Sequence, residues 1–206
     1  MLEKVEEVQE RLKSKLSNKR FIHTIGVRYT AAALAMRYGI SVEDASMAGV
    51  LHDCAKYFSD EELIKKCAKH NLQCSDVELR NGFLLHAKLG AYYAKKKYGV
   101  QNEEIISAVR YHTTGKPGMS LLEAIIFTAD YIEPNRNPLS HINEVRRMAF
   151  VDIDEAVYNI LDHTLDYLGE SAKCDRSGRE IDTHTIDAFV YYKKIHDEKF
   201  AEQCPD

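Results

Sequence analysis

Hydrophobic residues recur at steps of three and four along most of the chain, which is the spacing of an amphipathic α-helix. The first stripe runs from Leu2 to Leu16, with lysines and glutamates filling the opposite face. Serines before acidic residues mark several helix starts, and glycines or prolines mark several ends. The pattern predicts helices over residues 2–16, 20–38, 42–53, 60–67, 83–98, 103–111, 121–131, 142–150, 153–168 and 182–200.

The predicted helix boundaries have specific signals. Ser59 and Ser120 are expected to cap helices, and Glu123 completes a capping box with Ser120. Residues 113–118, Thr-Thr-Gly-Lys-Pro-Gly, form the clearest turn signal. Residues 169–179 are polar and are expected to connect two helices. No series of strands and no internal repeat is visible, so we expect an all-α fold: one domain with a C-terminal helical extension.

Composition and charge limit the possible partners. The 206 residues suit a single domain. The net charge of −4 argues against a general nucleic-acid coat, but it allows a small anionic ligand in a local basic pocket. No apolar run approaches the ~20 residues of a membrane helix, and the charged N-terminal stretch is unlike a signal peptide. Five cysteines without a Cys-x-x-Cys pair favour a reducing, cytoplasmic location.

The nine histidines fall into different sequence contexts. Four of them lie among polar neighbours and are interpreted as surface residues: His70, His141, His163 and His196. His184, between two threonines, is ambiguous. The remaining four, and two aspartates, follow or adjoin apolar stretches where burial is expected. They are His23, His52, Asp53, His86, His112 and Asp130.

A single buried histidine usually bonds to a backbone carbonyl, but six buried imidazoles and carboxylates together are costly to desolvate. A metal ion compensates this cost, because neutral imidazole and ionised carboxylate are its natural ligands. The six residues therefore predict a metal site. Mixed nitrogen and oxygen donors suit Fe, Mn, Zn or Ni, and the residues alone do not choose among these metals.

The order His, His-Asp, His, His, Asp resembles the signature of HD-domain metal-dependent phosphohydrolases. The flanking sequences are similar to those of the YqeK branch of that superfamily, over about residues 18–195. The segments that carry this resemblance are RFIHTIGV (20–27), LHDCAK (51–56), HAKLGA (86–91), YHTTG (111–115) and ADYIEPNR (129–136). The resemblance implies a single HD-domain helical bundle over residues 1–206. Its core would be residues 18–136, and the C-terminal helices of residues 137–206 would complete a nucleotide pocket.

The resemblance also implies an activity: symmetrical hydrolysis of diadenosine tetraphosphate to two ADP by a metal-bridged hydroxide. The centre would hold two divalent ions, with iron as the metal that the resemblance favours. One ion would be held by His23, His52, Asp53 and Asp130, and the other by Asp53 as a bridge with His86 and His112. Asp53 and Lys56 would be the catalytic residues.

Several polar residues are candidates for holding the polyphosphate. Lys56, on a helix continuing past Asp53, would point a cation at the reacting phosphate; otherwise it is a surface lysine. Arg20 lies one turn before the first ligand histidine and is a second candidate cation. His112 and Asp130 are expected to contact substrate as well as metal.

Arg136 could bind phosphate oxygens with its guanidinium, or could form a surface ion pair with Glu133. Thr113 and Thr114 could cradle phosphate in their turn, or could simply end the helix. Thr183 is a further expected contact in the C-terminal region. Tyr131 could stack on a base, but packing is favoured.

Alternative functions remain open at this stage. Another HD-type phosphohydrolase could act on a cyclic dinucleotide, a deoxynucleoside triphosphate or guanosine tetraphosphate, although the His-His-Glu and Gly-Tyr-Pro runs of the first class are absent. A non-catalytic module that senses ADP or GDP is the second alternative. We expect neither nucleic acid nor membrane as a partner. The stripe over residues 2–16 could pair with a second copy in a homodimer, but docking on the body is favoured.

Overall fold

The computed structural model describes residues 2–136, 141–174 and 181–203, and throughout these ranges the regular elements are helical. The all-α prediction is confirmed. The elements in chain order are α1 (Leu2–Lys13), α2 (Asn18–Tyr38), α3 (Val42–Leu51), α4 (Asp60–Lys69), α5 (Asp76–Arg80), a 3₁₀ turn (Gly82–Leu84), α6 (Leu85–Lys97), α7 (Glu103–Tyr111), α8 (Leu121–Ile132), α9 (Ile142–Ala149), α10 (Ile153–Cys174) and α11 (Thr183–Gln203).

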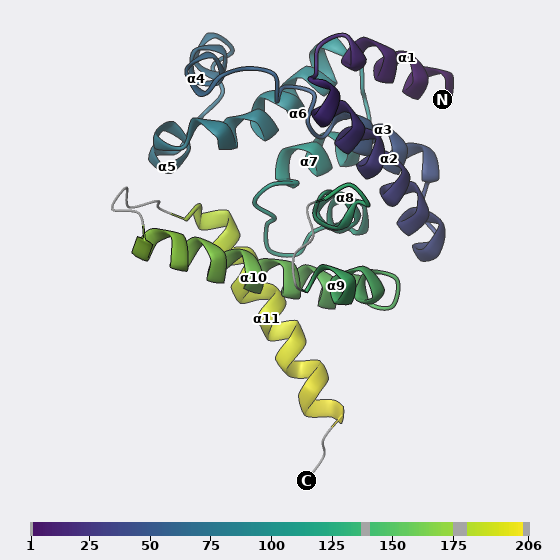
Figure 1. Ribbon diagram of the computed structural model, residues 1–206, viewed down its shortest axis with the longest axis vertical. Helices are drawn as coiled ribbons and strands as arrows, with labels where there is room; N and C mark the ends of the chain where they lie inside the picture. Colours follow the sequence, from purple (N-terminus) through teal and green to yellow (C-terminus); the bar gives the residue numbers. More distant parts are fainter. Residues whose placement is uncertain (1, 137–140, 175–180, 204–206) are drawn as a thin grey trace.

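The helices pack around α8, whose middle is almost wholly buried. The long α2 packs along α3 and against α8, and α7 lies between α6 and α8. Gly49 permits the close contact of α3 with α2, because a Cβ there would lie 2.9 Å from the Cα of Arg28. α10 crosses α8, and α11 packs on α10 before projecting away from the body (Figure 1). α3 contacts both α2 and α8, and α7 contacts α3, α6 and α8, so α7 joins the histidine-bearing α6 to the rest of the body.

Local sequence explains most of the helix boundaries. Ser59 and Ser120 form complete capping boxes with Glu62 and Glu123, as the serine–glutamate spacing predicts. The apolar stripe of α1 is buried against the body, with Leu12 fully inaccessible to solvent. The expected docking of the N-terminal stripe on the body is therefore confirmed. None of the helices in the described ranges has the length and apolarity needed to cross a bilayer.

Several elements differ from the sequence prediction, and α1, for example, ends at Lys13 instead of residue 16. α3 ends at Leu51, and residues 52–57 form successive turns instead of continuing the helix. α5 was not predicted, although its capping box of Ser75 and Glu78 is visible in the sequence. α10 continues to Cys174, so the predicted connection starting at residue 169 is wrong up to that point. A single glycine costs a helix only about 1 kcal/mol, which is too little to end it. Residues 175–180 lie outside the described ranges.

Candidate metal centre

Four histidines from separate parts of the chain meet in one buried cluster. His23 comes from α2, His52 from the end of α3, His86 from the first turn of α6 and His112 from the end of α7. All four are buried. The Nε2 atoms of His23 and His52 lie 3.3 Å apart, and those of His86 and His112 lie 3.1 Å apart. The structure thus brings together the four histidines that the sequence singled out.

The Nδ1 atoms of these histidines all have an acceptor outside the cluster. In three of them Nδ1 donates to the carbonyl oxygen three residues earlier. These pairs are His52 with Gly49 at 2.7 Å, His112 with Val109 at 2.8 Å, and His86 with Phe83. In His23, Nδ1 instead donates to Oε1 of Glu133 at 3.1 Å.

A proton on Nδ1 leaves Nε2 of a neutral imidazole with a lone pair. Within each histidine pair, two such lone pairs face each other, across 3.3 Å in one pair and 3.1 Å in the other. They repel unless a cation lies between them. This arrangement fits a metal centre.

The two carboxylates complete two groups of ligands. Oδ2 of Asp53 lies 3.4 Å from Nε2 of His52 and 3.8 Å from that of His23. Its other oxygen, Oδ1, lies 3.3 Å from Nε2 of His86 and 3.9 Å from that of His112. One carboxylate therefore faces both histidine pairs with a different oxygen, which is the geometry of a bridging ligand.

Asp130 belongs to the first of these groups. Its Oδ1 lies 3.0 Å from Nε2 of His23 and 3.9 Å from that of His52. The ligand atoms of His23, His52 and Asp130 all lie within 4.8 Å of one another, and so do those of His52, Asp53 and His112. The residues present fit a centre of mixed imidazole and carboxylate donors.

The protonation states of Asp53 and His112 suit metal binding, whereas at His52 burial lowers the pKa but the charge and hydrogen bond of Asp53 outweigh it and raise it. Burial by itself raises the pKa of Asp53, but the charge and hydrogen bonds of His52 and His86 outweigh it and hold that pKa well below its usual range. Burial, reinforced by the same two histidines, lowers the pKa of His112 to about 3. Asp53 is therefore ionised and His112 neutral near pH 7, which are the forms that bind metals.

A cavity of about 1050 Å³ opens beside this centre and is lined by parts of α2, α8, α10 and α11 and by the turn after α7. Of the eight predicted substrate contacts, six line it: Arg20, His112, Thr113, Thr114, Asp130 and Arg136. Arg20 Nη1 donates to Oδ2 of Asp53 at 2.7 Å while its side chain stays 36% exposed. Arg136 Nη1 lies 3.7 Å from Oδ1 of Asp130. Both guanidiniums thus stand at the edge of the centre.

Two other predicted contacts lie elsewhere. Lys56 is not among the residues that line the cavity; its Nζ lies 3.1 Å from Nδ1 of His86, and burial lowers the pKa of its ammonium group. The turns of residues 52–57, not a continuing helix, place it there. Thr183 is exposed at the start of α11, whereas its buried neighbours Asp182 and Thr185 line the cavity.

The cavity also contains residues that the sequence interpretation missed. His141 and His163 are not isolated on the surface: they are half-buried, line the cavity and stack with ring centroids 3.5 Å apart. The hydroxyl of Tyr131 lies 2.6 Å from Nε2 of His141. These residues meet because the start of α9 lies against α10, a contact between helices that no local pattern reveals. Glu133 was expected at most to pair with Arg136; its carboxylate is instead buried and bonded to His23.

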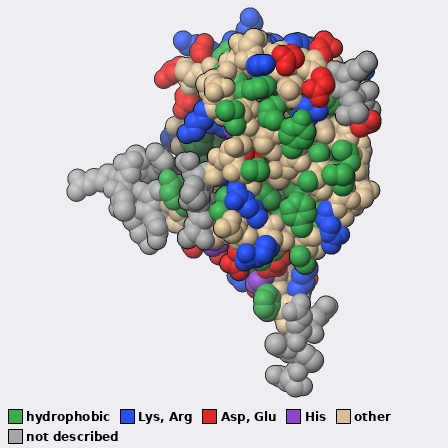
Figure 2. Space-filling view, turned by 45° about the vertical axis from the view of Figure 1, so that its right-hand side comes forward, with side chains coloured by type: hydrophobic (Ala, Val, Ile, Leu, Met, Phe, Trp, Pro, Cys, Tyr) green, Lys and Arg blue, Asp and Glu red, His purple; other side chains and the backbone are tan. Residues whose placement is uncertain are grey.

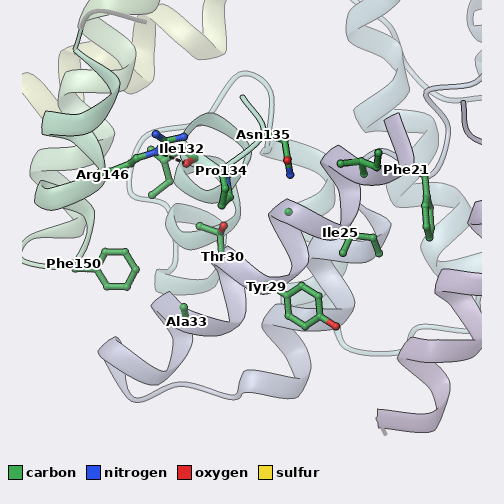
Figure 3. A pocket seen from close by; sticks show the side chains of 12 residues that line it. Phe21, Ile25, Tyr29, Thr30, Ala33, Ile132, Pro134, Asn135, Arg146 and Phe150 are labelled. Atoms are coloured by element: carbon green, nitrogen blue, oxygen red, sulfur yellow. Dashed lines mark hydrogen bonds between the residues drawn. The ribbon is translucent and has the colours of Figure 1, made fainter. Parts of the chain in front are cut away.

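A second cavity, of about 740 Å³, lies on the other side of α2. Its walls are mostly apolar, and Asn135 and Arg146 are the polar residues beside Thr30 that Figure 3 shows around it. Hydrophobic side chains are spread over the face that Figure 2 turns forward, with lysines and arginines among them. This cavity contains none of the six ligand residues.

The fold and the ligand series define a class of protein. The sequence profile of the HD domain matches residues 20–135, more than half of the chain, and the chain belongs to this family.

Three relatives within this family share one specific name. The symmetrical bis(5'-nucleosyl)-tetraphosphatase of Bacillus subtilis is 40% identical over 163 residues, which cover 79% of this chain and 87% of the relative. Proteins of the same name from Halalkalibacterium halodurans and Staphylococcus aureus are 41% and 32% identical, and the matches cover 83% and 94% of their lengths.

A solved structure has the same fold over nearly its whole length. It is described as a predicted HD superfamily hydrolase involved in NAD metabolism from Clostridium acetobutylicum. It is 36% identical to this chain, with a TM-score of 0.86, and the match covers 92% of this chain and 97% of that one.

Proposed function

We propose that this protein hydrolyses diadenosine tetraphosphate symmetrically to two ADP, using two divalent metal ions. The observation that carries the proposal is the pair of histidine groups that share the two oxygens of Asp53 beside a cavity of about 1050 Å³. Relatives that match over 83–94% of their lengths are named for this reaction. Phosphoanhydride hydrolysis is the chemistry that such paired metal sites support.

The proposed ligands are those predicted from the sequence. His23, His52, Asp53 and Asp130 would hold one ion, and Asp53, His86 and His112 the other. When bound, two such ions neutralise charge on a phosphoryl group and lower the pKa of water toward 7. Iron is the proposed metal, and the nitrogen and oxygen donors would also suit Mn, Ni or Zn.

The chain's own residues would orient the polyphosphate. Arg20 and Arg136 present guanidinium groups to the cavity at the edge of the centre, where they can fork onto phosphate oxygens. The hydroxyl of Thr113 lies 3.1 Å from Nε2 of His112, so it can donate to an oxygen bound at that point. The ammonium group of Lys56, 3.1 Å from Nδ1 of His86, would contribute positive charge beside the centre.

The far end of the same cavity would hold a nucleoside. The rings of His141 and His163 stack on each other, and the Tyr131 hydroxyl bonds to His141. In the cavity that they line with apolar side chains of α10, they offer flat surfaces for a base. Residues of α10 and α11 form this end, so the C-terminal helices would complete the nucleotide pocket of a single domain over residues 1–206. We place this reaction in the cytoplasm, where free thiols such as Cys54 stay reduced.

Product analysis tests the proposal. The protein, purified without oxygen, is incubated with diadenosine tetraphosphate, and the products are separated by ion-exchange chromatography. Two ADP support it; AMP with ATP would contradict symmetrical cleavage. Faster turnover of a cyclic dinucleotide, a deoxynucleoside triphosphate or guanosine tetraphosphate would favour another HD-type activity. Tight ADP binding without turnover at any of the four metals would indicate a sensor.

A further inference from the structure

We infer that Glu133 is a positioning residue for the metal ligand His23, and that Gly26 provides the space in which Glu133 does this. The inference rests on the proposed metal centre, but it concerns how one ligand is prepared and not which substrate is cleaved. The four histidines differ in the acceptor to which Nδ1 is bonded: a carboxylate in His23 and a backbone carbonyl in the other three.

Three of the histidines use backbone carbonyls because they lie near helix ends. His52 and His112 are the residues that end α3 and α7, where the last carbonyls have no partner within the helix. His23 lies inside the 21-residue α2, where carbonyls accept from the amide four residues later. The carbonyl three residues earlier, that of Arg20, also accepts from the hydroxyl of Thr24 at 3.0 Å. His23 therefore needs an acceptor from another element.

Glu133 supplies that acceptor from the end of α8. Its side chain is 1% exposed, and Oε1 accepts from Nδ1 of His23 at 3.1 Å. The other oxygen, Oε2, accepts from the backbone amide of Asn135 at 2.7 Å and from its Nδ2 at 3.1 Å. Arg146 holds the same segment by donating to the carbonyls of Ile132 and Glu133, both at 2.9 Å. Both carboxylate oxygens are therefore engaged, and the backbone behind them is fixed.

Gly26 makes this approach possible. It lies three residues after His23, on the same face of α2. A Cβ at this position would lie 2.2 Å from Oε2 of Glu133 and 3.3 Å from Nδ2 of Asn135. Because Oε2 also accepts two hydrogen bonds from Asn135, the carboxylate can yield only by giving up those bonds. Asn135 and Arg146, which also hold Glu133 in place, line the second cavity (Figure 3).

The consequence is control of the His23 tautomer. A carboxylate accepts only, so it keeps the proton on Nδ1 and leaves Nε2 free for a metal. Glutamine cannot replace it, since its amide has one acceptor oxygen for two sets of donors. Either Asn135 or His23 would then face the amide nitrogen, and in the second case the His23 proton moves to Nε2. Changes of this kind around a metal ligand typically cost about 10–100-fold in metal affinity.

The test compares Glu133→Gln and Gly26→Ala with Glu123→Gln as a matched control. Glu123 lies on the same helix and is 3% exposed, but its partners are Ser107, Ser120 and Lys116 and not a ligand histidine. Zn²⁺ affinity is measured by competition with a chromophoric chelator. The His23 tautomer is read in the metal-free protein from ¹⁵N chemical shifts of labelled histidine.

We expect Glu133→Gln and Gly26→Ala to weaken one of two Zn²⁺ by about 10–100-fold and to raise the Nε2–H fraction of His23. Glu123→Gln should change neither quantity. If both test variants keep wild-type Zn²⁺ affinity and the Nδ1–H tautomer of His23, the role of Glu133 is only to stabilise the end of α8, and the inference is wrong. If Glu133→Gln does not fold, Gly26→Ala decides, because it keeps the carboxylate in the chain. Failure of the wild type to cleave diadenosine tetraphosphate would overturn the proposed function and leave these two readouts untouched.

Discussion

Replacing Asp53 with asparagine should empty both metal positions at once, because its two oxygens face different histidine pairs at 3.3 and 3.4 Å. The change keeps the side chain's shape and removes its charge. Altering a residue behind a ligand already costs about 10–100-fold in affinity. Loss of a charged direct ligand should weaken metal binding more than this. We expect the Kd of each ion to rise about 1,000-fold, which corresponds to roughly 4 kcal/mol. At a metal concentration ten times the wild-type Kd, occupancy would then fall from about 90% to about 1%.

The assay is the metal content of protein dialysed against that concentration, measured by plasma emission spectrometry beside diadenosine tetraphosphate turnover. We expect two equivalents in the wild type, about one in His86→Ala, and close to none in Asp53→Asn. His86→Ala is the matched comparison, because it removes a donor from one group only. Far-UV circular dichroism confirms that each variant is folded. The bridging assignment is refuted if Asp53→Asn retains one full equivalent, since the two groups then do not share this ligand.

Other parts of the structure give further predictions. Arg136→Ala should raise the KM for the dinucleotide about tenfold while both metals stay bound, because its guanidinium is near Asp130 without being a ligand; an unchanged KM would place it outside the phosphate site. His163→Ala should weaken ADP binding in calorimetry by about tenfold but leave pyrophosphate binding unchanged, since only ADP carries a base to stack. Leu12→Ala should cost about 2–5 kcal/mol in urea unfolding, because the side chain is fully buried; a cost near zero would mean that α1 does not dock. The metal-free protein should lose stability as pH falls from about 6.5 toward 3, by up to about 1.4 kcal/mol for each pH unit. The reason is that His112 binds a proton in the unfolded chain but stays neutral in the folded protein, where its pKa is about 3. Urea unfolding at several pH values in the presence of a chelator measures this, and an unfolding free energy that does not change with pH would contradict it.

Local sequence predicted the elements because helices obey local rules. The capping box of Ser120 with Glu123 fixed the start of α8, and Gly39, with φ at 71°, ends α2 as its sequence position suggested. The end of α3 was missed because nothing within residues 52–57 forbids a helix. What the turns achieve is tertiary: they place the Asp53 carboxylate between both histidine pairs and Lys56 beside His86.

The residue types and their order, by themselves, indicated that this chain forms helices and carries six side chains suited to binding metal. Apolar periodicity and costly buried imidazoles and carboxylates can be recognised from the sequence alone. Tertiary structure decided how those side chains are used. The approach of Asp53 to His23, His86 and His112, the stack of His141 on His163 and the contact of Glu133 with Gly26 join residues 22 to 107 positions apart in the chain. Such contacts depend on how helices cross, and packing of the whole core, not the local pattern, sets those crossings.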